Sequence, residues 1–103
     1  PEYIPKGNNM AKMTALKILE EAAALKQQKS KDYQGSQFEE EDYFPFGDLS
    51  YMQMVHTKYL RMRSVLDQEH TNFESLEDSL IDMINYCAMW AAYIVNKEQS
   101  DEK

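Results

Sequence analysis

Four carboxylates close together on one predicted helix are the residues best placed for chemistry. A helix advances about 100° per residue, so Glu74, Asp78 and Asp82 share one side, while Glu77 projects near the edge of the apolar side. Carboxylate oxygens one turn apart suit Mg²⁺, and a metal held there could bridge the phosphates of a nucleotide. The alternative is a solvated acidic stripe whose first members are stabilised by the helix dipole. Both interpretations stay open on sequence alone.

Two basic residues on the preceding predicted helix carry the complementary charge. Lys58 and Arg61 are three residues apart and are therefore neighbours on one helical face. One interpretation is phosphate binding, with Arg as a bidentate fork and Lys as a point charge. The other is ion pairing with the acids of a neighbouring helix.

Three helices are predicted to position these residues. Apolar residues at helical spacing predict helices over about 13–31, 48–67 and 73–97. Glycine and proline number only three each, which suits long helices better than the many turns of an all-β fold. We therefore predict one all-α domain over residues 13–97. Residues 1–12 are predicted to be an irregular arm or an expression remnant, and residues 98–103 a solvated tail.

A long loop between the first two helices, KDYQGSQFEEEDYFPFGD at residues 31–48, mixes aromatic residues with a run of acids. A connection of this length inside a small domain is usually functional or mobile. We expect the aromatic residues within 43–46 to pack on the bundle or on a neighbouring subunit, and the acids of 39–42 to be solvated. The loop is thus predicted to be an anchored lid with an acidic outer edge.

The third predicted helix is apolar around most of its circumference over NYCAMWAAYIV, residues 85–95. Such a helix must be buried on several sides, and two shorter helices cannot cover it. The pattern predicts a homo-oligomer in which several chains complete the helical bundle. Cys87, within this segment, is interpreted as a core residue.

The composition indicates which kinds of partner and which cellular compartment to expect. A net charge of −7 lacks the basic surplus on which binding of free nucleic acid depends. The single cysteine permits no internal disulfide and fits a reducing compartment. The longest apolar run is shorter than the roughly 20 residues that span a bilayer. We therefore predict a soluble, cytoplasmic protein with no membrane partner.

Three segments resemble the nucleotide-modification-associated domain family. They are D-Y-x-G-S at residues 32–36, K-x-x-R at 58–61 and ESLEDSLIDMINY at 74–86. This family comprises small all-α proteins of bacteria and their phages, similar in pattern to the MazG-like nucleotide pyrophosphohydrolases. The resemblance implies an oligomeric helical bundle with a nucleotide pocket and Mg²⁺, in the host cytoplasm if a phage encodes it. The residues then expected to bind the nucleotide are Asp32, Tyr33, Lys58, Arg61 and Asn85.

The match to the MazG-like pattern is incomplete. Those enzymes carry E-x-x-E on one helix and E-x-x-D on the next. Here Glu20 and Glu21 are adjacent on the first predicted helix, and Ser75 stands three residues before Asp78.

Three functional hypotheses follow. The first is a Mg²⁺-dependent nucleoside triphosphate pyrophosphohydrolase, in which Asp32 or Glu21 completes the metal shell begun by the acids of the third helix. The second is a non-catalytic protein that sequesters a nucleotide or a nucleotide-derived signal. The third is a structural helical module that contacts other proteins through its methionine-rich and apolar helices.

Overall fold

The computed structural model describes residues 12–101, apart from the side chains of Tyr33 and Asp101. The described range holds three α-helices and two short 3₁₀ helices and contains no strand: α1 (Ala15–Ser30), η1 (Lys31–Tyr33), η2 (Glu40–Tyr43), α2 (Asp48–Leu66) and α3 (Phe73–Asp101). The predicted all-α class is confirmed. The expected N-terminal arm falls almost wholly on residues 1–11, which lie outside the described residues.

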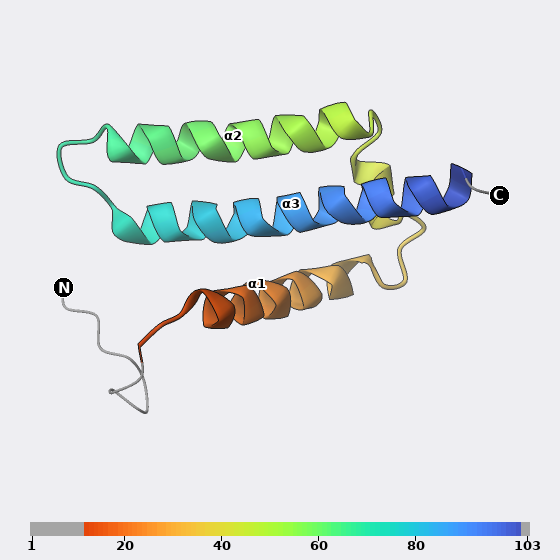
Figure 1. Ribbon diagram of the computed structural model, residues 1–103, viewed down its shortest axis with the longest axis horizontal. Helices are drawn as coiled ribbons and strands as arrows, with labels where there is room; N and C mark the ends of the chain where they lie inside the picture. The colour runs from red at the N-terminus through yellow and green to blue at the C-terminus, as the bar shows by residue number, and fades with distance from the viewer. Residues whose placement is uncertain (1–11, 102–103) are drawn as a thin grey trace.

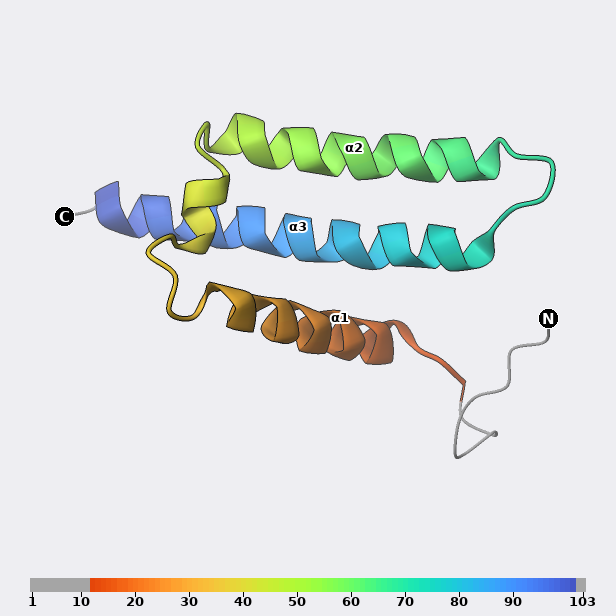
Figure 2. The same ribbon diagram turned by 180° about the vertical axis from the view of Figure 1, so that it is seen from behind.

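The three helices lie side by side with α3 in the middle (Figures 1 and 2). Helix α2 runs antiparallel to α3 and packs along it extensively, whereas α1 runs parallel to α3 and contacts it less. The segment with η1 and η2 leads from the end of α1 across to the start of α2, near the C-terminal half of α3. Since α3 touches both other helices, its side chains can meet residues from each.

The core is centred on Tyr51, which is only 1% exposed. Its ring stacks on Phe44 at 4.2 Å between centroids and 11° between planes, and it also contacts Trp90 and Tyr93 of α3. The indole Nε1 of Trp90 donates a hydrogen bond of 2.7 Å to Asp48 Oδ1 at the start of α2. These aromatic contacts join the first turns of α2 to the C-terminal half of α3 and to the loop.

Gly47, the residue just before α2, is one that no other residue replaces easily. Gly47 has φ 58° and ψ −125°, a conformation that is strained for residues with a Cβ. A Cβ atom there would lie 2.6 Å from the Tyr93 hydroxyl. The chain can therefore turn into α2 close against α3 only because residue 47 lacks a side chain.

Phe44 anchors the loop to the bundle. Phe44 is half-buried between Tyr51 and Tyr86, the latter in an edge contact at 6.3 Å. Tyr43 is 54% exposed and lines a pocket, and Phe46 is 76% exposed, so packing of this segment on a neighbouring subunit stays a prediction. The acids are largely solvated as expected, but Glu40 is half-buried and forms an ion pair with Lys26.

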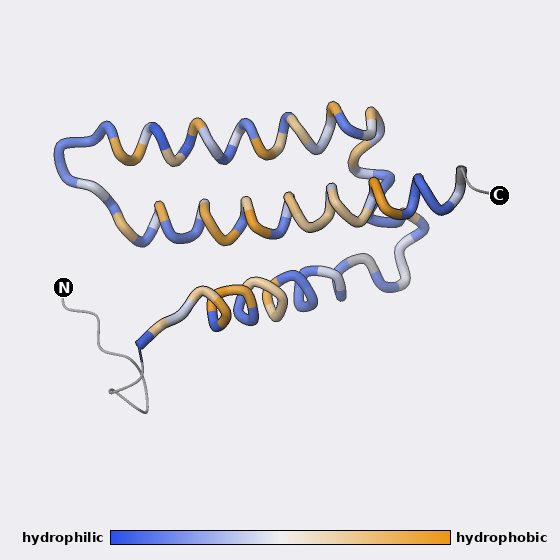
Figure 3. Tube along the Cα trace, in the orientation of Figure 1, coloured by the Kyte–Doolittle hydropathy of each residue, from blue (hydrophilic) through white to orange (hydrophobic). Residues whose placement is uncertain are grey.

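Two further predictions about α3 were wrong. The helix continues to Asp101, beyond the predicted end at residue 97, because the sequence there has no glycine or proline to stop it. Figure 3 shows that its apolar stretch is followed by hydrophilic turns. Cys87, interpreted as core, is exposed, because neither α1 nor α2 covers its side of α3. Among the described helices, none has the length and apolar character needed to cross a membrane.

Candidate functional site

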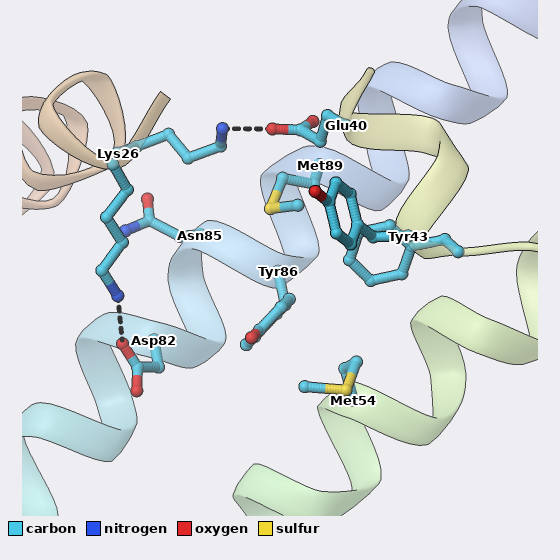
Figure 4. Close-up of a pocket in the computed structure, with 10 residues that line it drawn as sticks. Lys26, Glu40, Tyr43, Met54, Asp82, Asn85, Tyr86 and Met89 are labelled. Atoms are coloured by element: carbon cyan, nitrogen blue, oxygen red, sulfur yellow. Dashed lines mark hydrogen bonds and ion pairs between the residues drawn. The ribbon is translucent and has the colours of Figure 1, made fainter. Parts of the chain in front are cut away.

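A pocket of about 280 Å³ opens where α1, η2, α2 and α3 meet (Figure 4). We call it the aromatic pocket, because three aromatic rings and two methionines form much of its wall. Its lining residues are Lys26, Lys29, Glu40, Tyr43, Phe44, Met54, Asp82, Asn85, Tyr86 and Met89.

The walls of the aromatic pocket suit a flat ring with polar edges. In Figure 4 the rings of Tyr43 and Tyr86 and the thioethers of Met54 and Met89 surround its space. Aromatic faces and polarizable sulfur atoms pack well on planar ligands. The amide of Asn85 offers both hydrogen-bond donors and an acceptor at the same site. Charged side chains, those of Lys26, Lys29, Glu40 and Asp82, complete the lining, so the pocket combines apolar faces with polar groups, as small-molecule sites do.

Asp82 joins two lysines from different helices. Its Oδ2 lies 2.9 Å from Lys58 Nζ on α2, and its Oδ1 lies 3.7 Å from Lys29 Nζ on α1. One carboxylate between two ammonium groups leaves one positive charge in excess at this point. An ammonium group that shares its carboxylate with a second lysine can also donate to an anionic group such as a phosphate.

A second pocket, of about 470 Å³, lies between α1 and α3 and is called here the acidic groove. Four of its lining residues are carboxylates, and the complete lining is Glu21, Leu25, Lys29, Glu77, Asp78, Ile81 and Asp82. Lys29 and Asp82 line both pockets. The two pockets therefore adjoin at this ion pair.

The acidic groove contains carboxylates of the kind that bind Mg²⁺, but it does not contain a complete set of ligands. Carboxylate oxygens are the protein ligands that Mg²⁺ prefers. Over residues 12–101, however, no three acidic, histidine or cysteine side chains are grouped closely enough to hold an ion. Mg²⁺ is commonly bound through one or two carboxylates plus the phosphates of a substrate. The groove supplies carboxylates for that form of binding, and Mg²⁺ there stays a prediction.

The structure brings some of the predicted site residues together. Glu77, Asp78 and Asp82 line the acidic groove with Glu21, and Asn85 lines the aromatic pocket. For Lys58 the alternative interpretation was ion pairing with an acid of a neighbouring helix. Lys58 does pair with Asp82, which belongs to α3.

Other predicted site residues lie elsewhere. Glu74 is exposed in the first turn of α3, Arg61 is exposed on α2, and Asp32 is exposed in η1. None of these three lines the aromatic pocket or the acidic groove. The side chain of Tyr33 lies outside the described part of the structure. A role in binding stays a prediction for these four residues, as it does for those that line the two pockets.

Sequence reasoning missed the lysines of α1 and the aromatic walls. Lys26 and Lys29 are three residues apart on one face of α1, a spacing that could have marked them as a pair. Tyr86 lies within an apolar run, which predicts a core position as readily as a pocket wall. Only the placement of α1 beside α3 reveals that these side chains share a pocket.

The surroundings of Tyr51 and of Arg63 raise the pKa of each side chain. Burial raises the pKa of the Tyr51 phenol, and the charges of Glu41, Glu40 and Tyr93 add to the effect. The phenol behind the aromatic pocket is therefore neutral at ordinary pH. A hydrogen bond to the Tyr59 hydroxyl raises the pKa of Arg63, whose guanidinium also lies over the Tyr59 ring.

Comparison with known proteins finds no matching family model, no matching curated protein and no matching solved structure. Function is therefore inferred from the chemistry of the two adjoining pockets.

Proposed function

We propose that the protein binds a nucleotide across the two pockets. The base would enter the aromatic pocket, and the phosphates would extend over Lys29 towards the acidic groove. One observation carries this proposal: a pocket with flat apolar walls and a groove with carboxylates share Lys29 and Asp82. A nucleotide has a flat heterocycle at one end, which suits the aromatic pocket, and phosphates at the other, which could approach the carboxylates of the groove with Mg²⁺ between them.

The aromatic pocket favours a single base. Stacking of a base on an aromatic side chain contributes about 1–3 kcal/mol, and Tyr43 and Tyr86 both offer a ring. Asn85 supplies an amide that can hydrogen-bond to the edge of the base. A volume of about 280 Å³ is near the lower limit of ligand sites, which suits one nucleoside rather than a dinucleotide.

Lys29 is the lysine best able to turn towards a phosphate. Its contact with Asp82, at 3.7 Å, is longer than the 2.9 Å contact of Lys58 with the same carboxylate. Its side chain is also 58% exposed, against 16% for Lys58. Lys58 can therefore hold Asp82 in place while Lys29 exchanges the carboxylate for a phosphate oxygen.

A triphosphate would reach the acidic groove, where like charges would oppose it. Glu77, Asp78 and Asp82, with Glu21 from α1, are the residues that would hold Mg²⁺ there. When bound, Mg²⁺ neutralises charge between the carboxylates and the phosphates. Binding of a triphosphate is therefore expected to depend on Mg²⁺ more strongly than binding of a monophosphate.

Hydrolysis of the bound nucleotide is a second candidate, favoured by the carboxylates beside the expected phosphate positions. The products would be a nucleoside monophosphate and pyrophosphate, formed by adding water across one phosphoanhydride bond. Chromatography of the nucleotide after incubation distinguishes the two candidates. Released pyrophosphate supports hydrolysis, and unchanged ligand supports binding alone.

Calorimetric titration with canonical and modified nucleotides, with and without Mg²⁺, tests the proposal. Lys29→Met should weaken binding of the tightest ligand at least about tenfold, because a charge-assisted hydrogen bond is lost. Lys17→Met is the matched control, since this exposed lysine of α1 lies outside both pockets. Absence of binding by every nucleotide under both conditions would refute the proposal, as would equal effects of the two substitutions.

A further inference from the structure

The chain between two glycines forms part of the wall of the aromatic pocket. Gly35 and Gly47 both have a positive φ, at 83° and 58°. We call the residues between them, 36–46, the strap, which passes from the end of α1 to the start of α2 (Figure 1). Its middle is η2, which lines the aromatic pocket through Glu40 and Tyr43. Because glycine adopts more backbone conformations than other residues, the strap can turn at both of its ends.

Hydrogen bonds within the strap keep its shape. The Glu39 backbone N–H donates to Asp42 Oδ2 at 2.8 Å, and the Asp42 N–H donates to the Glu39 carbonyl oxygen at 3.0 Å. The Phe44 N–H donates to the Glu41 carbonyl oxygen at 3.0 Å. Each of these bonds joins two residues of the strap, so movement of the strap as a unit breaks none of them.

Two side chains connect the strap to different helices. Phe44 stacks on Tyr51 of α2 and makes an edge contact with Tyr86 of α3. Glu40 forms an ion pair with Lys26 of α1, and Figure 4 shows this pair running between α1 and η2. Phe44 therefore fixes the strap near the start of α2, while Glu40 ties its middle to α1.

Local contacts favour the pairing of Lys26 with Glu40. Lys26 Nζ also donates to Ser30 Oγ at 3.0 Å, and Ser30 Oγ donates to the Lys26 carbonyl oxygen at 2.9 Å. These bonds orient the ammonium group before it meets the carboxylate. Glu40 is half-buried, whereas the other acids of 39–42 are exposed. The two opposite charges offset each other, so the pair links two elements of the pocket wall without adding net charge to it.

We propose that the Lys26–Glu40 ion pair is a latch that closes the strap over the aromatic pocket, and that its release opens the pocket. The proposal rests on the proposed function only for the identity of the ligand that enters. The side chains of the pair are 27% and 32% exposed, and ion pairs in contact with solvent contribute modestly to stability. Thermal motion can therefore release the latch, and its loss should raise the open fraction about two- to fivefold.

Oxidation of methionines by hydrogen peroxide measures this opening without any nucleotide. Met54 and Met89 are half-buried in the wall of the aromatic pocket, and we call them the wall methionines. Met62 and Met83 are also half-buried but line neither the aromatic pocket nor the acidic groove. Peroxide reaches the wall methionines faster when the strap is open, whereas Met62 and Met83 report on the stability of the whole fold. Mass spectrometry gives the rate of sulfoxide formation at each methionine.

Glu40→Gln removes the charge of the latch. The variant should raise the oxidation rates of the wall methionines about two- to fivefold and leave those of Met62 and Met83 unchanged. Glu41→Gln is the matched control, because it makes the same charge change at the next, exposed residue of η2 and should alter none of the rates. Equal rates in wild type and Glu40→Gln would overturn the proposal. A rise at all four methionines, or the same rise in Glu41→Gln, would also overturn it.

Charge reversal tests the pairing itself. Lys26→Glu places two acids against each other and should speed oxidation of the wall methionines. Adding Glu40→Lys restores an ion pair with its charges exchanged and should return the rates close to those of the wild type. A double variant that is oxidised as fast as Lys26→Glu alone would contradict the latch. These measurements use no nucleotide, so they decide about the latch separately from the calorimetric test of nucleotide binding.

Discussion

At the scale of single residues, Asp82 connects the structure to the proposed chemistry. It forms ion pairs with Lys58 on α2 and with Lys29 on α1, and it lines both pockets. The sequence indicated Asp82 as a candidate metal ligand, and Lys58 as a residue that binds phosphate or pairs with an acid of a neighbouring helix. It could not indicate Lys29 as the third member, because that contact depends on how α1 packs beside α3.

Tyr51 gives a prediction about alkaline pH. Burial raises the pKa of its phenol above the ordinary value of 10.0. As pH rises through about 10, the unfolded chain loses this proton while the folded protein keeps it. The unfolded state is then favoured, so the stabilising effect present below pH 10 is lost above it.

Tyr51→Phe removes this titrating group from the core. The free energy of unfolding, measured by urea denaturation between about pH 9 and about pH 11, should fall less steeply in the variant than in the wild type. Parallel curves for the two proteins would show that Tyr51 does not contribute to the alkaline loss of stability.

At the scale of elements, periodicity predicted the helices well. The predicted ranges 13–31 and 48–67 correspond to α1 (Ala15–Ser30) and α2 (Asp48–Leu66). The errors concern burial, because the hydrophobic pattern of one helix does not say where the neighbouring helices lie. Cys87 lies in a segment that is apolar on most sides, and the sequence alone cannot tell which side a neighbouring helix covers.

The turn into α2 gives a prediction about Gly47. Gly47→Ala forces a residue with a Cβ into a positive φ and brings that atom against the Tyr93 hydroxyl. We expect a loss of about 2–3 kcal/mol in the free energy of unfolding, measured with urea. Gly35→Ala is the control, because Gly35 also has a positive φ but has open space around it, and it should cost only about 1 kcal/mol. Equal losses in the two variants would show that contact with Tyr93 has no effect.

At the scale of the whole molecule, α3 lies between the two other helices and presents a third side to solvent. Towards α1 and α2 it supplies Asp82, Asn85 and Tyr86 to the candidate site, and away from them Leu80, Cys87 and Ile94 are exposed. The apolar circumference in the sequence predicted that α3 needs more cover than two helices give. The aromatic pocket could not be predicted, because its wall combines α1, η2, α2 and α3.

Methyl NMR on the methionines tests nucleotide binding most directly, because their side chains report from different surfaces. Met54 and Met89 line the aromatic pocket, whereas Met52 is exposed and lines neither pocket. Titration with Mg²⁺ and the nucleotide that binds most tightly should shift the methyl signals of Met54 and Met89 and leave that of Met52 in place. A nucleotide that binds while shifting Met52 and neither pocket methionine would contradict the proposed site.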